Sequence, residues 1–155
     1  MKKVIKKILL IGFILFLLIQ IYQPARNIDK GQAPSDGFAN FYNAPQQIQK
    51  ILQNSCYDCH SNNTSYPAYS YIQPARYLME KHIKGGKEEL NFNEWKNYST
   101  RKQRNKLNGI IEQIEDDKMP LDSYTLLHKN AKLSAKQKNE MVNWLSVIQK
   151  QQNDR

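Results

Sequence analysis

The chain has 155 residues, of which 23 are lysine or arginine and 14 are aspartate or glutamate, so its formal net charge is +9. This length suits one compact domain with a tail or an anchor and argues against a second full domain. Six of the basic residues but only one acidic residue lie within residues 1 to 30. The rest of the chain mixes both signs without a basic, aromatic-rich stripe, so we expect no nucleic-acid partner.

An apolar segment near the amino terminus follows four lysines. Residues 8 to 21 are apolar except for Gly12 and Gln20. The lysines are Lys2, Lys3, Lys6 and Lys7. This pattern is typical of an export signal, and because no signal-peptidase pattern of small residues follows it, residues 1 to 22 are predicted to stay as a transmembrane helix. The lysines predict a cytoplasmic amino terminus and a periplasmic domain, anchored by a single pass in a bacterial inner membrane.

Three further regions are predicted after this segment. Residues 23 to 44 contain several prolines and glycines and few aliphatic side chains. This composition indicates an extended tether. A folded domain is expected over residues 45 to 150, and residues 151 to 155 are expected to form a polar tail.

The predicted domain begins with two amphipathic helices. The first is expected to start at Pro45 and to run into Cys56, with three aliphatic residues at helical spacing. These are Ile48, Ile51 and Leu52. The second is expected to start at Pro74 and to stop at Gly85 and Gly86. Its predicted apolar face, on which the histidine is expected to be packed and hydrogen-bonded, comprises Ala75, Leu78, Met79, His82 and Ile83.

Two more helices are predicted beyond a loop at residues 91 to 98, whose aromatic side chains are expected to be buried. Ser99 is a candidate cap for the third helix, which is expected to end before Pro120. Ser134 and Gln137 form a capping-box pattern for the last helix. The aliphatic and aromatic residues expected to face the core are Leu107, Ile110, Ile111, Ile114, Met141, Trp144, Leu145 and Ile148. No strand pattern of comparable length is present, so the sequence predicts an all-α domain.

The chemistry of the chain is concentrated in one motif. Its two cysteines and a histidine follow one another as Cys56-Tyr57-Asp58-Cys59-His60. This is the C-x-x-C-H spacing of c-type haem attachment. In one helical turn both thiols reach the same side as the histidine. We therefore expect one covalent haem c, bonded through Cys56 and Cys59, with His60 as the proximal iron ligand.

Two other uses of the cysteines fit the sequence less well. A dithiol redox pair of the thioredoxin type is expected beside a βαβ pattern, which is absent, and it needs no histidine directly after it. A zinc site would combine the two thiols with a pair drawn from His60, His82 and His128. Neither a second C-x-x-C nor an H-x-x-x-H pattern accompanies them.

The sequence resembles known proteins at two levels. The order of helix, C-x-x-C-H, variable middle, Met-Pro and terminal helix resembles monohaem cytochrome c. From Pro45 to about Lys150 the chain is similar to a family of small bacterial haem-binding domain proteins. The matching residues are Cys56-Tyr57-Asp58-Cys59-His60-Ser61-Asn62-Asn63-Thr64, Tyr66-Pro67, Ile72-Gln73-Pro74, Met119-Pro120 and Ser123-Tyr124-Thr125-Leu126-Leu127-His128. The resemblance implies a cytochrome c-like helical fold, haem binding and an envelope location, but no particular substrate or partner.

Met119 is the leading candidate for the sixth iron ligand, because Pro120 follows it and the carboxy-terminal helix lies beyond, as in cytochromes c. Pro120 lacks a backbone donor and is expected to end the third helix, so that the thioether is presented from an extended loop. A thioether favours ferrous iron, which suits electron transfer. His128 is the alternative ligand, and an open position is the third. Met79 and Met141 are expected to be packing residues.

The function expected from these features is electron transfer by a haem protein, which makes and breaks no substrate bonds. The competing function is a haem enzyme or a small-ligand sensor with an open distal site, peroxidase-like in its chemistry. The sequence names no redox partner protein, although a mild positive charge would steer an acidic one. The coordination of the iron distinguishes the two functions.

Overall fold

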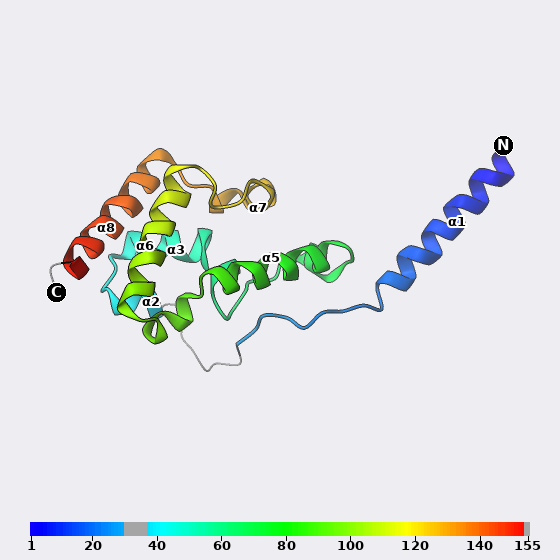
Figure 1. The fold of residues 1–155 in the computed structure, drawn as a ribbon. Coiled ribbons are helices and arrows are strands. Elements are labelled where there is room, and N and C mark those ends of the chain that lie inside the picture. Colours follow the sequence, from blue (N-terminus) through cyan, green and yellow to red (C-terminus); the bar gives the residue numbers. More distant parts are fainter. Residues whose placement is uncertain (30–36, 154–155) are drawn as a thin grey trace.

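The computed structural model describes residues 1–29 and 37–153, and all regular elements in these ranges are helices (Figure 1). The all-α prediction is therefore confirmed for the described residues. The α-helices are α1 (Lys2–Ile19), α2 (Gly37–Phe41), α3 (Gln46–Ser55), α4 (Tyr57–His60), α5 (Ala75–Glu89), α6 (Thr100–Glu115), α7 (Asp122–Leu127) and α8 (Ala135–Asn153). Three 3-10 helices join them: η1 (Ala68–Tyr71), η2 (Phe92–Asn97) and η3 (Lys129–Ala131).

The apolar amino-terminal segment forms α1, which is shorter than the predicted transmembrane helix. It has 18 residues, ends at Ile19, and includes all four lysines. Its apolar part, residues 8–19, is about 18 Å long at 1.5 Å per residue, whereas the hydrocarbon core of a bilayer is roughly 30 Å thick. Within the described ranges, no helix combines the length and the apolar character that a membrane span requires. The predictions of a membrane helix and of a single-pass inner-membrane location are therefore wrong.

The chain after α1 runs along the domain, and residues 20–27 are called here the docked segment. Gln20 and Gln73 exchange two hydrogen bonds, from Gln73 N to Gln20 Oε1 (2.9 Å) and from Gln20 Nε2 to Gln73 O (3.4 Å). Arg76 donates to Gln23 Oε1 at 2.6 Å and to the carbonyl oxygen of Pro24. This part of the segment predicted to be a tether is thus bound to the domain.

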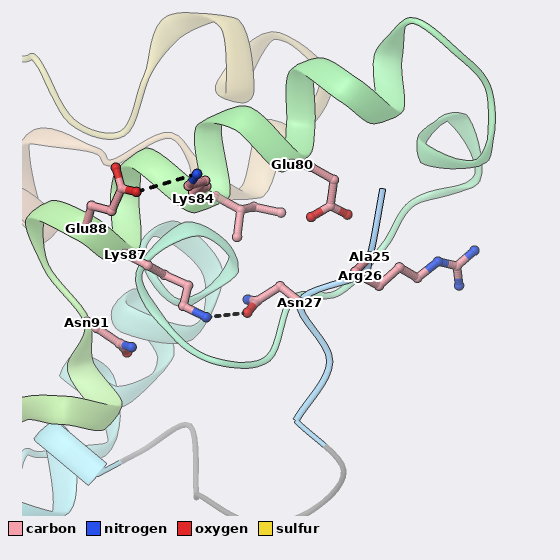
Figure 2. A pocket seen from close by; sticks show the side chains of 9 residues that line it. Ala25, Arg26, Asn27, Glu80, Lys84, Lys87, Glu88 and Asn91 are labelled. Atoms are coloured by element: carbon pink, nitrogen blue, oxygen red, sulfur yellow. Dashed lines mark hydrogen bonds and ion pairs between the residues drawn. The ribbon is translucent and has the colours of Figure 1, made fainter. Parts of the chain in front are cut away.

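Asn27 is the most strongly held residue of the docked segment. Its backbone N–H donates to Tyr66 Oη (2.6 Å), and its side-chain amide donates to Ser61 O (2.8 Å) and Thr64 Oγ1 (2.9 Å). Lys87 Nζ donates to its Oδ1 at 2.6 Å (Figure 2). The docked segment and α5 border an open cavity of about 410 Å³. The cavity is lined by Ala25, Arg26, Asn27, Glu80, Ile83, Lys84, Lys87, Glu88 and Asn91.

The segment predicted to be a tether also contains a core element, because its residues 37–41 form the short helix α2. Phe38 is fully buried, with ring centroids 4.8 Å from Phe92, 4.6 Å from Trp95 and 5.7 Å from Trp144. An isolated five-residue helix is unstable in water, so tertiary packing of its apolar side chains stabilises it. Residues 30–36 of the predicted tether lie outside the described residues.

The main core lies between α3, α6 and α8, and Figure 1 shows α6 and α8 packed together at the end of the domain away from α1. The buried aliphatic residues of these helices are Ile48, Ile51, Leu52, Leu107, Ile114, Met141, Leu145 and Ile148. Ser99 Oγ accepts from Lys102 N at 3.3 Å, which confirms the predicted cap. Ser134 and Gln137 form the predicted capping box, with hydrogen bonds of 2.9 and 3.3 Å.

Helix α5 differs from its prediction in length and in its buried face. It continues through Gly85 and Gly86 to Glu89 instead of stopping at the glycines. Its buried side chains are Arg76 and Ile83, whereas Leu78 and His82 are exposed. The expected packed role of His82 is therefore wrong. The docked segment explains why Arg76 is buried: Gln23 and Pro24 of this segment accept the hydrogen bonds of its guanidinium group and lie against that face of α5.

The end of α6 is set by a turn that begins before Pro120. Asp117 adopts a positive φ of 57°, its N–H donates to Ile114 O (3.3 Å), and Lys118 N–H donates to Gln113 O (2.9 Å). These two bonds form a Schellman motif, which satisfies carbonyls that the helix end leaves free. The helix ends before Pro120 as expected, but the turn and not the proline ends it.

Candidate functional site

The C-x-x-C-H motif forms a single helical turn directly after α3, and its last four residues are α4. Cys56 ends α3, with its N–H donating to Leu52 O at 3.0 Å. Its own carbonyl accepts from Cys59 N (3.2 Å) and from His60 N (3.0 Å). These bonds close one helical turn, which brings residues i, i+3 and i+4 to the same side. Both cysteines are free thiols, and both are half-buried.

The ring of His60 is oriented by backbone carbonyls of the α5 carboxy-terminal end. Its Nδ1 lies 2.9 Å from Gly86 O and 3.0 Å from Leu90 O, both of which can only accept. Nδ1 therefore carries the proton, and Nε2 keeps its lone pair. Burial lowers the pKa of His60, and the two carbonyl hydrogen bonds oppose this shift less strongly. A neutral imidazole whose second nitrogen donates to a carbonyl is the usual form of a metal-ligating histidine.

Gly86 allows α5 to approach the motif this closely. A Cβ atom at this position would lie 2.8 Å from the carbonyl oxygen of Cys59 and 3.3 Å from its Cβ. Real Cβ atoms are not found so close to a backbone oxygen, so any side chain here would push α4 and α5 apart. The glycine predicted as a helix stop is thus a packing requirement of the site.

Asp58, inside the motif, is held by residues from distant parts of the chain. Its Oδ1 accepts from Ser65 N at 2.9 Å, and its Oδ2 accepts from Tyr124 Oη at 2.6 Å. The ring of Tyr124 stacks on His128, with centroids 4.2 Å apart and an interplanar angle of 11°. His128 Nε2 shares a hydrogen bond of 2.6 Å with Tyr69 Oη. Burial, followed by the bond to Asp58, raises the pKa of Tyr124, so its phenol donates at neutral pH.

The two candidates for the sixth ligand are placed differently. Met119 is half-buried, and its N–H donates to Gln113 O at 3.1 Å, which fixes its backbone to the end of α6. It lies in the loop between α6 and α7, next to the end of α6. Among the described residues, His128 is linked to the motif through the stacked Tyr124, whereas the backbone hydrogen bond of Met119 connects it to α6.

The state of the thiols bears on the zinc alternative. Loss of hydration on partial burial is the main factor that raises the pKa of Cys56 to about 12 and that of Cys59 to about 11. Both thiols are therefore protonated at neutral pH when no metal or haem is bound. In residues 1–29 and 37–153, no three His, Cys, Asp or Glu side chains come close enough together to hold a metal ion.

Sequence reasoning missed the residues that orient the motif. Gly86 and the carbonyl of Leu90 are 26 and 30 residues from His60, and Tyr124 is 66 residues from Asp58. No local periodicity links positions so far apart. The only available signal was an unusual glycine pair within a helical pattern, together with tyrosines gathered around the histidines.

Comparison with known proteins agrees with this site. A family model described as a haem-binding domain matches residues 14–147, which include the motif, Met119 and His128. The cytochrome c peroxidase Ccp of Escherichia coli (strain K12) is 29% identical over 99 residues, or 62% of this chain and 21% of that protein. The matched part thus covers about a fifth of that curated relative. No solved structure matches the chain.

Proposed function

Because this chain belongs to the haem-binding domain family, we propose that it carries one haem c on the C-x-x-C-H turn and acts as an electron-transfer protein. The observation that carries the proposal is the orientation of His60. Its Nδ1–H is engaged by two carbonyls, at 2.9 and 3.0 Å, which leaves Nε2 as the free ligand atom. When bound, the haem supplies an iron that changes reversibly between the ferrous and ferric states.

The two thiols are the proposed points of attachment. Each would add its S–H across one vinyl group, the sulfur bonding to one carbon and the hydrogen passing to the other, so no oxidant is needed. The cysteines lie at the two ends of one turn, and the backbone bonds to the carbonyl of Cys56 hold that spacing. Attachment on one side and ligation by His60 on the same side would fix the plane of the porphyrin.

We propose Met119 as the sixth ligand, with His128 as the alternative. Nε2 of His128 is already bonded to Tyr69 at 2.6 Å, and its ring is stacked on Tyr124. Ligation by that nitrogen would cost the hydrogen bond. The thioether of Met119 has no such bond to lose, and its backbone is anchored to α6. A soft sulfur ligand raises the reduction potential and leaves no open position for a substrate.

Covalent attachment is tested on denatured protein produced with a c-type haem maturation system. We expect the wild type to keep its haem in a denaturing gel, and Cys56→Ala and Cys59→Ala each to retain a single thioether. The pyridine haemochrome of each single variant should then lie between those of haem b and haem c. The double variant should lose all colour on the gel. Extraction of the wild-type haem by acidified acetone would overturn the covalent assignment.

The sixth ligand is tested by the weak red-end band that a methionine–iron bond gives in the ferric spectrum. We expect the band in wild type, its loss in Met119→Ala, and its retention in Met79→Ala, a matched methionine that is half-buried on α5. Retention in Met119→Ala would show that this assignment is wrong.

The relative named as a cytochrome c peroxidase favours one second candidate, a haem with an open distal position that reacts with peroxide. The discriminating measurement is the addition of peroxide to the reduced wild-type protein. A six-coordinate electron carrier should react slowly, and Met119→Ala should react much faster. Rapid reaction of the wild type, without the red-end band, would support the peroxidase-like function instead.

A further inference from the structure

We propose that Tyr124, His128 and Tyr69 form a positioning group that acts through Asp58 to set the reduction potential of the haem iron. The inference rests on the proposed function, because it requires a haem on the C-x-x-C-H turn. None of the three side chains needs to touch the iron. They act by holding the carboxylate of Asp58 in position.

Asp58 is a fixed carboxylate inside the haem motif. It lies between the two cysteines and two residues before His60, so it is on the same helical turn as the proposed iron ligand. Each of its carboxylate oxygens has one donor, Ser65 N at 2.9 Å and Tyr124 Oη at 2.6 Å. Thr64 Oγ1 also donates to its backbone carbonyl at 2.6 Å. The turn, the side chain and its orientation are thus all fixed by hydrogen bonds.

Tyr124 is the donor that tertiary structure brings to Asp58, and His128 holds it in place. The two rings lie almost parallel, 4.2 Å apart, at the carboxy-terminal end of α7. The other side of this arrangement is closed by Tyr69 on η1, whose hydroxyl is bonded to His128 Nε2. The three aromatic residues therefore join α7 and η1 to the motif through one short contact after another.

The electrostatic consequence has a definite sign. A carboxylate near the iron stabilises the more positive, ferric state and lowers the reduction potential. A hydrogen bond from a neutral hydroxyl to a carboxylate is strong and draws charge away from the oxygen. The bond from Tyr124 should therefore raise the potential relative to a free Asp58. Outer groups of this kind commonly tune a metal site without ligating it.

The test is a cycle of two substitutions, with the potential measured by redox titration of the haem-loaded protein at pH 7. We expect Tyr124→Phe to lower the potential, because the ring remains and only the donor is lost. Asp58→Asn should raise it. In the Asp58→Asn background, Tyr124→Phe should lose most of its effect, because the charge through which it acts has been removed. A purely structural role of Tyr124 predicts no such dependence.

The control is Tyr77→Phe, which removes the hydroxyl of a tyrosine that is 47% exposed. It should leave the potential unchanged. The inference is overturned if Tyr124→Phe leaves the potential at the wild-type value. It is also overturned if the shift is equally large in both backgrounds, because the effect would then not pass through Asp58.

Two substitutions of His128 separate its two contacts. His128→Phe keeps a ring to stack on Tyr124 but loses the bond to Tyr69, so the potential should shift only slightly in the direction of Tyr124→Phe. His128→Gln keeps a partner for Tyr69 but loses the stack, so the potential should shift in the direction of Tyr124→Phe. The reverse order would overturn the inference. If Asp58→Asn does not fold, this pair decides the question, with far-UV circular dichroism to confirm folding.

These outcomes are distinguishable from failure of the proposed function. A wild type without covalent haem overturns both statements, and the denaturing gel reveals it before any potential is measured. If the wild type carries covalent haem but the shifts in potential caused by Tyr124→Phe and Asp58→Asn are additive, only the positioning role is overturned. Loss of iron ligation in His128→Phe, seen as a changed ferric spectrum, would make His128 a ligand and likewise overturn the positioning role.

Discussion

Gly86 and Cys59 are in backbone contact at the centre of the site. A Cβ on Gly86 would lie 2.8 Å from the carbonyl oxygen of Cys59. The carbonyl of the same glycine accepts a hydrogen bond of 2.9 Å from His60 Nδ1–H. One residue thus sets the separation of α4 from α5 and the orientation of the proposed iron ligand. A Cβ atom on the adjacent Gly85 would have no neighbouring packing atom within 4 Å.

These two glycines predict opposite effects of the same substitution. Gly86→Ala should destabilise the fold by about 1–3 kcal/mol through overpacking and should reduce the fraction of haem-loaded protein. Gly85→Ala should be neutral or stabilising by about 0.5–1 kcal/mol, because alanine is the better helix former. Chemical denaturation and the ratio of haem to protein absorbance measure both. Equal effects at the two positions would contradict the close contact.

Phe38 is predicted to be an anchor of the core despite its place in a segment without a long helix. It has no exposed surface and packs on four aromatic rings, those of Tyr42, Phe92, Trp95 and Trp144. Phe38→Ala should cost about 3–5 kcal/mol of unfolding free energy. Phe41→Ala is the matched control on the same helix, because that ring is 43% exposed. It should cost far less. If Phe38→Ala also unfolds at nearly the wild-type denaturant concentration, α2 does not belong to the core.

Asn27 is predicted to hold the docked segment on the domain. Asn27→Ala removes bonds to Ser61 O, Thr64 Oγ1 and Lys87 Nζ, and it should destabilise by roughly 1–3 kcal/mol. Limited proteolysis should then cut the segment near this position sooner than in wild type. The neighbouring Ile28→Ala is the control, since that side chain is 49% exposed. Unchanged proteolysis of Asn27→Ala would show that the segment is held by other contacts.

His60 predicts a pH dependence of the haem-free protein. Its pKa is lowered from 6.5 by burial in the folded chain, so above that value both folded and unfolded chains hold it neutral. Below about pH 6.5 the unfolded chain binds the proton more readily, and stability falls as the pH falls. Unfolding midpoints between pH 7.5 and 5.5 measure the slope.

The control for this prediction compares the half-buried His60 with the exposed His82. His60→Gln does not titrate and can still donate to a carbonyl, so it should reduce the slope. His82→Gln, at an exposed position, should leave the slope unchanged. A slope that persists in His60→Gln would assign the effect to other groups.

Local sequence was sufficient for several features. The helix over residues 46–55, the Ser99 cap and the capping box of Ser134 and Gln137 agree with the structure because each depends on residues within one or two helical turns. The same holds for the turn of the C-x-x-C-H motif. The chemistry proposed for it rests on this spacing, since residues i, i+3 and i+4 meet in any helical turn.

The tertiary structure decided what surrounds that motif. The burial of Phe38, the passage of α5 through Gly86 and the bond from Tyr124 to Asp58 all differ from, or were absent from, the expectations based on sequence. Each depends on partners more than a helix length away along the chain, and their packing outweighs local propensity. The amino-acid sequence alone therefore identified the atoms of the proposed haem site, and long-range packing determined their orientation.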